Sequence, residues 1–555
     1  MKRLYMVVSL LMLTLMISAQ PSWVKKASKS VFTLKTFTAD GSLLGSATGF
    51  YVGKNGEAVS CFAPFKGAQR AVVIDAAGKE FPVECILGAN DTYDVVKFRV
   101  ATKKAQPVTL ATIQPDKGAK VWLLPYGPAK HVPEGTLRKL ETFNEAYAYY
   151  TIALQMPENT MGAPLYNNEG EVLGLMQQPA MLTDTLNYAV SVLFADSLKM
   201  TGLSINDPVM RSTGVKKALP EDIGQAQLTL FIAGSSLDSL AYAQLIDEFI
   251  LQFPSHPDGY TTRAQLLTEA RRFADAEQNM LQAMKVAEKP DEIHYAFSRL
   301  MMQKLVYMAD EAFEPWTLDR CYEEAGEAYR INPQPSYRQQ QAVVRYAQQQ
   351  YDEAYTIYES LFNSSLRSPE LFYAASVCKE QLKDTTAQLA LLDSCVAQFS
   401  QPYLKEAAPY LIGRAQVLVG MGRYRAAVND YNEYETIMKA QVNSNFYYLK
   451  FQAEVAGRLF QQALDDIDKA ITMTPQSDLY YAEKASLQVR LGLYDEAIPT
   501  ATTCIQLAPE HSDGYLFLGL AQCLKGQKAE GVKNLKKAGE LGDPQAEELI
   551  EKYSK

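Results

Sequence analysis

Residues 475–515 read PQSDLYYAEKASLQVRLGLYDEAIPTATTCIQLAPEHSDGY, and this stretch decides the fold of the C-terminal half. Its first residue, Pro475, recurs 34 residues later as Pro509. The same interval of 34 residues separates the members of two further columns, which are Tyr447, Tyr481 and Tyr515, and Ala463, Ala497 and Gly531. Three columns in phase indicate an internal repeat of helical units that stack on one another.

Each repeat is predicted to be a helix, a turn and a second helix. Small residues such as Gly519 and Gly531 let the two helices approach closely, and a proline ends the second helix because it cannot donate the next hydrogen bond. The pattern resembles the tetratricopeptide repeat (TPR) family. Looser matches upstream extend the array to roughly eight units over residues 220–544, followed by a polar capping segment, Asp543–Lys555.

The resemblance implies a superhelical solenoid with a concave groove lined by the first helix of each unit. Such grooves bind other proteins or peptides, so we expect partners of that class here. The candidate groove residues are Tyr448, Gln452, Ser486, Arg490 and Leu516.

The N-terminal part shows a different pattern, in which short β-prone runs alternate with turn signals. The predicted strands are Val31–Phe37, Thr48–Val52, Ala71–Ile74, Val95–Val100, Lys120–Leu124, Tyr147–Leu154, Glu171–Leu175 and Asn187–Val190. This is an all-β barrel or sandwich pattern. We therefore expect a multidomain chain with a β domain over residues 20–205, a linker over 206–220 and an all-α repeat domain over 221–555.

Four blocks of the β region resemble the trypsin-like serine proteases, specifically their Deg-type bacterial branch. The blocks are Ser46–Val52 with Ala58–Phe65, then Thr92–Phe98, then Asn159–Leu165 with Gly170–Leu175, and finally Asn187–Ser191. They follow the order of that family, which implies a double β-barrel. In this resemblance the catalytic histidine falls on Ala63, the aspartate on Asp94 and the nucleophilic serine on Met161.

The residues at these positions decide the expected activity. Acyl transfer needs a nucleophile, a base that takes its proton, and donors for the oxyanion. A methyl group at Ala63 accepts no proton, and a thioether at Met161 has none to lose. Asn159 and the pair Gly162-Ala163 also depart from the glycines of the family's loop. We therefore predict a pseudoprotease, in which Asp94 is structural and accepts backbone hydrogen bonds.

Two other readings of the β domain stay open. One is an active peptidase with a relocated nucleophile, Thr160 or Cys61, and His131 as its base; only one of the four histidines, His131, lies in the first 255 residues. The other is a barrel that still binds extended peptides without cutting them. The sequence otherwise predicts neither a cofactor nor a metal site.

Residues 1–19 have the layout of a cleaved secretory signal peptide, with Lys2 and Arg3 before an apolar run and small residues before Gln20. We expect an exported protein, periplasmic or extracellular, with no transmembrane segment in the mature chain. Cleavage changes the formal net charge from −9 to −11, because it removes two basic residues. An acidic chain is a poor match for nucleic acid. Export permits a disulfide, and Cys61 with Cys85 is the candidate pair.

Overall fold

The computed structural model describes residues 20–127, 132–158, 160–178 and 185–554. It divides into two compact units, with the division between Ala287 and Glu288, and each unit is described by itself. The predicted signal peptide lies outside the described residues. Within them, no helix is both long enough and apolar enough to cross a bilayer.

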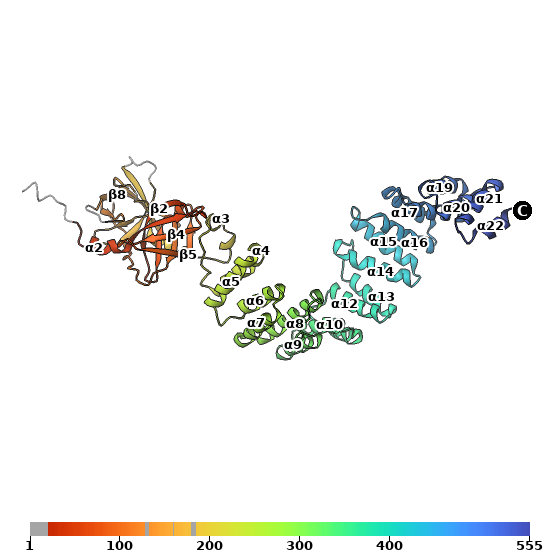
Figure 1. Ribbon diagram of the computed structural model, residues 1–555, viewed down its shortest axis with the longest axis horizontal. Coiled ribbons are helices and arrows are strands. Elements are labelled where there is room, and N and C mark those ends of the chain that lie inside the picture. The colour runs from red at the N-terminus through yellow and green to blue at the C-terminus, as the bar shows by residue number, and fades with distance from the viewer. Residues whose placement is uncertain (1–19, 128–131, 159, 179–184, 555) are drawn as a thin grey trace, which may run out of the picture. The chain divides into compact units, whose positions relative to one another are not determined.

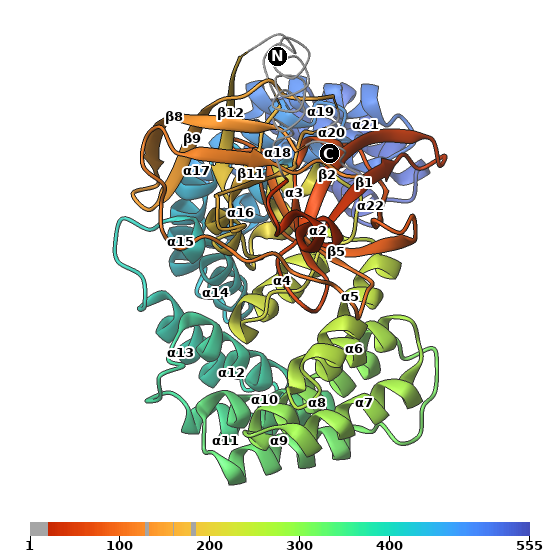
Figure 2. The same cartoon turned by 90° about the vertical axis from the view of Figure 1, so that its left-hand side faces the viewer.

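The β region forms two closed antiparallel barrels of six strands each, as the sequence predicts (Figures 1 and 2). In the first barrel the strand order is β1-β2-β3-β6-β5-β4, and the strands are β1 (Val31–Phe37), β2 (Leu43–Tyr51), β3 (Glu57–Ser60), β4 (Arg70–Ile74), β5 (Glu80–Asn90) and β6 (Val95–Val100). Alternate residues of β1 point into a core that contains Phe32, Leu34 and Phe98.

The second barrel has the strand order β10-β11-β12-β9-β8-β7. Its strands are β7 (Lys120–Leu123), β8 (Glu134–Phe143), β9 (Tyr147–Ala153), β10 (Pro164–Tyr166), β11 (Val172–Met176) and β12 (Leu186–Ser191). Phe50 and Cys61 from the first barrel join Tyr166 and Leu175 from the second in one buried cluster, so the two barrels share an apolar interface. Before β1, Trp23 stacks on Tyr166 with 4.6 Å between ring centroids.

The segment predicted as a linker instead packs on the first barrel. Between Ser191 and Ile223 the chain forms η3 (Val192–Asp196), η4 (Ser204–Asn206) and α3 (Pro208–Arg211). Met210 and Val215 are buried in the core of the first barrel. Ile86 of β5 donates to Lys216 O at 2.8 Å and accepts from the amide of Ala218 at 2.9 Å. Backbone pairing and apolar burial thus make this segment part of the β domain.

Nineteen helices follow between Ile223 and Tyr553, a range that the structure describes throughout. Those of the first unit are α4 (Ile223–Ser236), α5 (Ser239–Gln252), α6 (Pro257–Glu269) and α7 (Phe273–Val286). Those of the second unit are α8 (Pro290–Tyr307), α9 (Leu318–Ile331), α10 (Pro335–Ala347), α11 (Tyr351–Ser360), α12 (Pro369–Gln381), α13 (Thr385–Val396), α14 (Ala408–Gly420), α15 (Tyr424–Met438), α16 (Ser444–Ala456), α17 (Phe460–Met473), α18 (Asp478–Arg490), α19 (Tyr494–Leu507), α20 (Ser512–Leu524), α21 (Lys528–Glu540) and α22 (Ala546–Tyr553).

The helices form nine pairs plus a final helix, so the expectation of roughly eight units is one too low. The close approach predicted for the small residues is confirmed. A Cβ built on Gly519 would lie 2.7 Å from the carbonyl oxygen of Gly531, and one built on Gly531 would lie 2.7 Å from that of Gly519.

Candidate functional site

Ala63 and Asp94 lie next to each other at the interface between the barrels. Ala63 begins the short helix η2 (Ala63–Phe65) after β3, and Asp94 directly precedes β6. Because β3 and β6 pair with Ser60 opposite Val96, the two residues meet at the same end of the strands. The amide of Ala63 donates a hydrogen bond to Oδ1 of Asp94 at 2.6 Å. Asp94 thus accepts a backbone hydrogen bond, as expected, and its purely structural role stays a prediction.

The Asp94 carboxyl is half-buried, and burial is the largest influence on its pKa, which it raises. The hydrogen bond from Ala63 acts in the opposite direction, because it stabilises the charged form. Asp94 also has a φ of 48°, in the left-handed region that is uncommon for a residue other than glycine. Strain of this kind persists only where the surroundings hold it. Here the bond to Ala63 contributes to holding it.

Met161 lies on a loop that is fastened to the first barrel. The amide of Thr48 on β2 donates to the carbonyl oxygen of Met161 at 2.8 Å. The next residue, Gly162, has a φ of +81° and its amide donates to Met176 O at 2.9 Å. The Met161 side chain is half-buried and packs against the apolar clusters of both barrels, in company with Cys61 and Tyr93. The fold therefore gathers Ala63, Asp94 and Met161 in one place.

The amides of this loop are used within the chain. Gly162 N–H donates to Met176 O, and Ala163 N–H donates to Thr160 O at 3.0 Å. These bonds fix the shape of the loop. The oxyanion donors of a serine protease are the amides of the nucleophile and of the residue two before it, which correspond here to Met161 and Asn159. Asn159 lies outside the described residues.

The residues considered as substitute nucleophiles are both buried. Thr160 is 1% exposed, and its hydroxyl donates to Pro157 O at 2.7 Å, which is the bonding of a turn hydroxyl. Cys61 is 0% exposed, and burial, aided by the nearby Asp94 charge, raises the pKa of its thiol well above the ordinary value. A thiol is nucleophilic as the thiolate, so this environment keeps Cys61 unreactive. His131 lies outside the described residues.

Residues 47–175 match the trypsin-like peptidase domain family. This chain contains a trypsin-like peptidase domain. Its barrels are similar to the active form of a Mycobacterium tuberculosis protease, with 17% identity, a TM-score of 0.28, and coverage of 32% of this chain and 82% of that one. They are also similar to a serine endoprotease from Yersinia pestis, with 15% identity, a TM-score of 0.28, and coverage of 34% and 65%.

The helical region matches TPR-containing proteins. It is similar to the small glutamine-rich tetratricopeptide repeat-containing protein 2 of Saccharomyces cerevisiae, with 28% identity over 106 residues, 19% of this chain and 31% of that protein. It is also similar to a TPR repeat-containing thioredoxin of Arabidopsis thaliana, with 29% identity over 82 residues, 15% of this chain and 22% of that protein. The chain thus spans less than a third of the length of these relatives.

An aromatic pocket of about 300 Å³ lies beside Asp94 in the trypsin-like domain. Its walls include Tyr93, Phe143, Tyr149 and Gln177. The side-chain amide of Gln177 donates through Nε2 to Tyr93 O at 2.8 Å and accepts through Oε1 from the Tyr149 hydroxyl at 2.5 Å, so it is held rigidly in place. Sequence reasoning missed this pocket, although Tyr93, which precedes Asp94, and the tyrosines along β9 are the signal that could have found it.

The five predicted groove residues differ in how far their side chains are exposed to a partner. Tyr448 and Gln452 lie one turn apart on α16, as do Ser486 and Arg490 on α18, and Gln452 and Arg490 are exposed. The Tyr448 hydroxyl donates to Glu483 at 3.1 Å. Leu516, in contrast, is only 4% exposed and packs with Leu535 and Ala538 in the core between α20, α21 and α22. Its side chain is part of that core and leaves almost no surface for a ligand.

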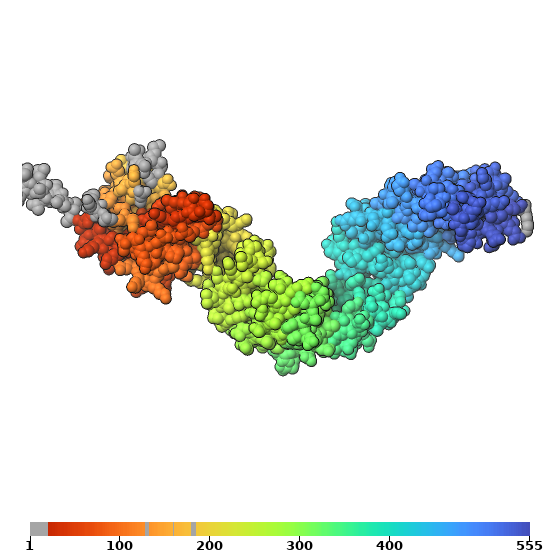
Figure 3. Space-filling view, in the orientation of Figure 1, coloured from red at the N-terminus to blue at the C-terminus, as the bar shows by residue number. Residues whose placement is uncertain are grey.

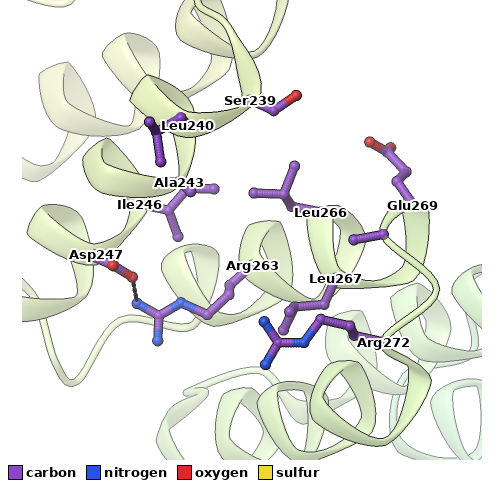
Figure 4. Close-up of a pocket in the computed structure, with 11 residues that line it drawn as sticks. Ser239, Leu240, Ala243, Ile246, Asp247, Arg263, Leu266, Leu267, Glu269 and Arg272 are labelled. Atoms are coloured by element: carbon purple, nitrogen blue, oxygen red, sulfur yellow. Dashed lines mark hydrogen bonds and ion pairs between the residues drawn. The ribbon is translucent and has the colours of Figure 1, made fainter.

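A second apolar cavity, of about 570 Å³, lies between α5 and α6 (Figure 4). Leu240, Ala243 and Ile246 of α5 face Leu266 and Leu267 of α6 across it. The charged groups at its rim are paired within the chain, since Arg263 binds Asp247 and Arg272 binds Asp275 at 2.5 Å. The cavity therefore presents an apolar surface, and both of its arginines are already paired with carboxylates.

Proposed function

We propose that this protein is an exported, non-catalytic scaffold, in which the TPR-like array binds protein partners and the trypsin-like domain does not cleave peptides. The observation that carries the proposal is that the fold gathers Ala63, Asp94 and Met161 in one place, although neither the Ala63 nor the Met161 side chain can give or take a proton. In a serine protease triad the aspartate holds the histidine that serves as base. Here a solvent-exposed methyl group stands at the position of the histidine, and residue 63 bonds to the carboxylate only through its main-chain amide, which almost any residue would supply.

Activity-based labelling tests the absence of catalysis. The mature chain, residues 20–555, is treated with a fluorophosphonate probe beside trypsin as the labelled control. We expect no labelling, because Met161 offers no hydroxyl to react. Labelling that disappears on a point change within residues 20–200, such as Thr160→Ala, would refute the proposal and favour the peptidase with a relocated nucleophile.

Partner capture tests the role of the array. The mature chain and a double variant, Gln452→Glu with Arg490→Glu, are used to capture proteins from the exporting cell. The matched control, Gln461→Glu with Lys533→Glu, makes the same charge change at exposed positions of α17 and α21. We expect a partner that is lost with the groove variant and kept with the control. Identical capture by all three proteins would contradict binding through these groove residues.

The same proposal places the mature protein outside the cytoplasm, in the periplasm or the medium. It is supported by the layout of residues 1–19, and N-terminal sequencing of the exported product tests it. We expect the sequence to begin at Gln20. A product that retains Met1 and stays in the cytoplasm would contradict export.

Peptide binding by the trypsin-like domain is a second candidate function, favoured by the aromatic pocket beside Asp94. Tyrosine and phenylalanine walls with a fixed amide are typical of sites that receive an apolar side chain. Restoring the triad residues by changing Ala63→His and Met161→Ser together tests whether a usable cleft survives. Regained cleavage of peptides would support it, and an inert double variant that still folds would count against it.

A further inference from the structure

A cavity of about 700 Å³ lies within the first unit, where the first barrel meets α4. Its walls come from β3 and β6, from the chain after η3, and from the segment that leads into α4. The part of the chain that follows the barrels adjoins them at this junction, as the colours of the space-filling view in Figure 3 show. The amide of Gly202 donates to Gln225 of α4 at 2.8 Å, and the side chain of Gln252 donates to Pro220 O at 2.8 Å. These bonds hold the walls of the cavity together.

Arg99 on β6 lines this cavity and has no ionic partner there. Its neighbour across the strands is Glu57 of β3. The Glu57 carboxylate is turned back over the chain, because a Cβ built on Gly53 would lie 1.8 Å from its Oε2. Among the described residues Arg99 forms no ion pair, and its Nε is buried without a hydrogen-bond partner. An unsatisfied buried donor is costly and calls for a missing ligand or water.

Two of the other charged side chains that line the cavity have partners within the chain. Lys97 forms an ion pair with Asp196 at 2.9 Å. Asp222 caps α4 and accepts from the amide of Gln225 at 2.9 Å. In the neighbouring cavity of about 660 Å³, Lys216 pairs with Glu248 at 2.6 Å. Among the described residues that line this cavity, Arg99 is thus a half-buried cation without an ion pair, and the exposed Lys199 is a further cation of the lining.

The rest of the lining restricts which anion fits. Four carboxylates also border the cavity, those of Glu57, Asp196, Glu221 and Asp222, and they repel a ligand that carries two negative charges. The remaining walls are largely apolar and include Val52, Leu110, Leu198, Met200 and Leu219. Apolar walls with one oriented polar group are typical of sites for small ligands, which occur preferentially between domains.

We propose that this junction cavity binds a monocarboxylate with an apolar body, and that Arg99 receives the carboxylate. A guanidinium matches a carboxylate with two parallel hydrogen bonds. The carboxylate comes either from a fatty acid or from the free C-terminus of an apolar peptide. In both cases the ligand contacts β6 and the segment next to α4 at once, so binding stabilises the junction between the trypsin-like domain and the first helix pair.

Calorimetric titration of the mature chain tests the charge requirement. The probes are octanoate and octanamide, and the tripeptide N-acetyl-Leu-Leu-Leu with a free or an amidated C-terminus. We expect at least one acid to bind, and its amide to bind at least about tenfold more weakly. Binding by octanoate alone identifies a lipid-derived acid, and binding by the peptide acid alone identifies a peptide end. If no acid binds, or if each acid and its amide bind alike, the proposal is overturned.

A variant locates the ligand. Arg99→Gln is expected to lower the affinity for the acid at least about tenfold and to leave the affinity for the amide unchanged. Arg70→Gln is the matched control, because Arg70 is an exposed cation of the same barrel whose side chain lies over Phe37, outside the cavity. Equal binding by Arg99→Gln and the unaltered chain would refute the site. If Arg99→Gln does not fold, a second variant, Met200→Trp, tests the site. Its larger side chain fills the cavity and must abolish binding of the acid.

Discussion

The amide of Ala63 donates a hydrogen bond to Oδ1 of Asp94 over 2.6 Å, and this contact joins the turn after β3 to the start of β6. Removing the acceptor with Asp94→Ala leaves the amide unsatisfied and places alanine at a left-handed φ. We expect the free energy of unfolding to fall by about 1–3 kcal/mol. Asp94→Asn should cost less, because the side-chain amide oxygen can still accept and asparagine tolerates this conformation.

Calorimetric melting of both Asp94 variants measures the difference. The barrel transition should shift further for Asp94→Ala than for Asp94→Asn. Equal shifts would mean that the hydrogen bond contributes nothing. Peptidase assays on the same proteins should give no change, since the proposal assigns Asp94 a structural role.

Alternating burial made some of the strands predictable from the sequence. β1 has this pattern, with Phe32, Leu34 and Thr36 inside, and it appears where expected. β8 lacks it, because most of its residues after Leu137 are exposed, so the polar run Arg138–Glu141 carries no signal of a strand. Its place in the barrel is set by pairing with β7 and β9, which depends on the rest of the fold.

The three protease-like positions could be found from the sequence because each lies within a short motif. The junction cavity could not, because it exists only after residues 196–222 fold back on the first barrel. No pattern in the sequence around Arg99 indicates that the Glu57 side chain turns away from it. The buried position of Leu516 was missed for a related reason, since its burial depends on packing with α21 and α22 at the end of the array.

Substitution of Gly162 tests how tightly the loop that carries Met161 is held against the first barrel. A Cβ built on it would lie 2.1 Å from Thr48 O, and its φ is +81°. Gly78 has nearly the same φ, +82°, but no atom within 4 Å of its Cβ position. Both changes to alanine add the strain of a left-handed residue, about 1–2 kcal/mol. Only Gly162→Ala adds a clash with the backbone of β2.

Denaturant unfolding of the two alanine variants separates strain from clash. We expect Gly162→Ala to lose at least about 1 kcal/mol more than Gly78→Ala, because overpacking costs about that much or more. Similar losses would show that the loop shifts away from Thr48 freely.

The seven cysteines provide a test that requires no substitution. All are free and buried, including Cys61 and Cys85, the pair considered for a disulfide. Burial raises the pKa of both thiols. A thiol-specific reagent should therefore react slowly with the native protein, and it should titrate seven thiols in the unfolded, unreduced chain. A result of five would reveal one disulfide and contradict the structure.

Glu454 makes the second unit sensitive to pH. It is 1% exposed on α16, beside Asp466 of α17 and 4.0 Å from Lys450. Burial, followed by the charge of Asp466, raises its pKa to about 8. Lys450 is shared with other carboxylates, since it pairs with Glu435 at 2.6 Å and with Asp466 at 2.8 Å. We therefore expect Glu454 to be protonated in the folded chain at neutral pH.

This raised pKa gives stability that is fully present below the ordinary value of 4.5 and is lost as pH rises through 8. The reason is that the unfolded chain releases the proton in that window while the folded chain keeps it. Glu454→Gln cannot ionise, so we expect it to be more stable than the natural chain at pH 8.5, by about 1–3 kcal/mol, and to differ less at pH 5. Guanidinium unfolding at the two pH values, with hydrogen exchange of α16 and α17, measures this. Glu433→Gln, an exposed change on α15, should show no such pH dependence. An identical response of the two variants would mean that Glu454 is ionised in the fold.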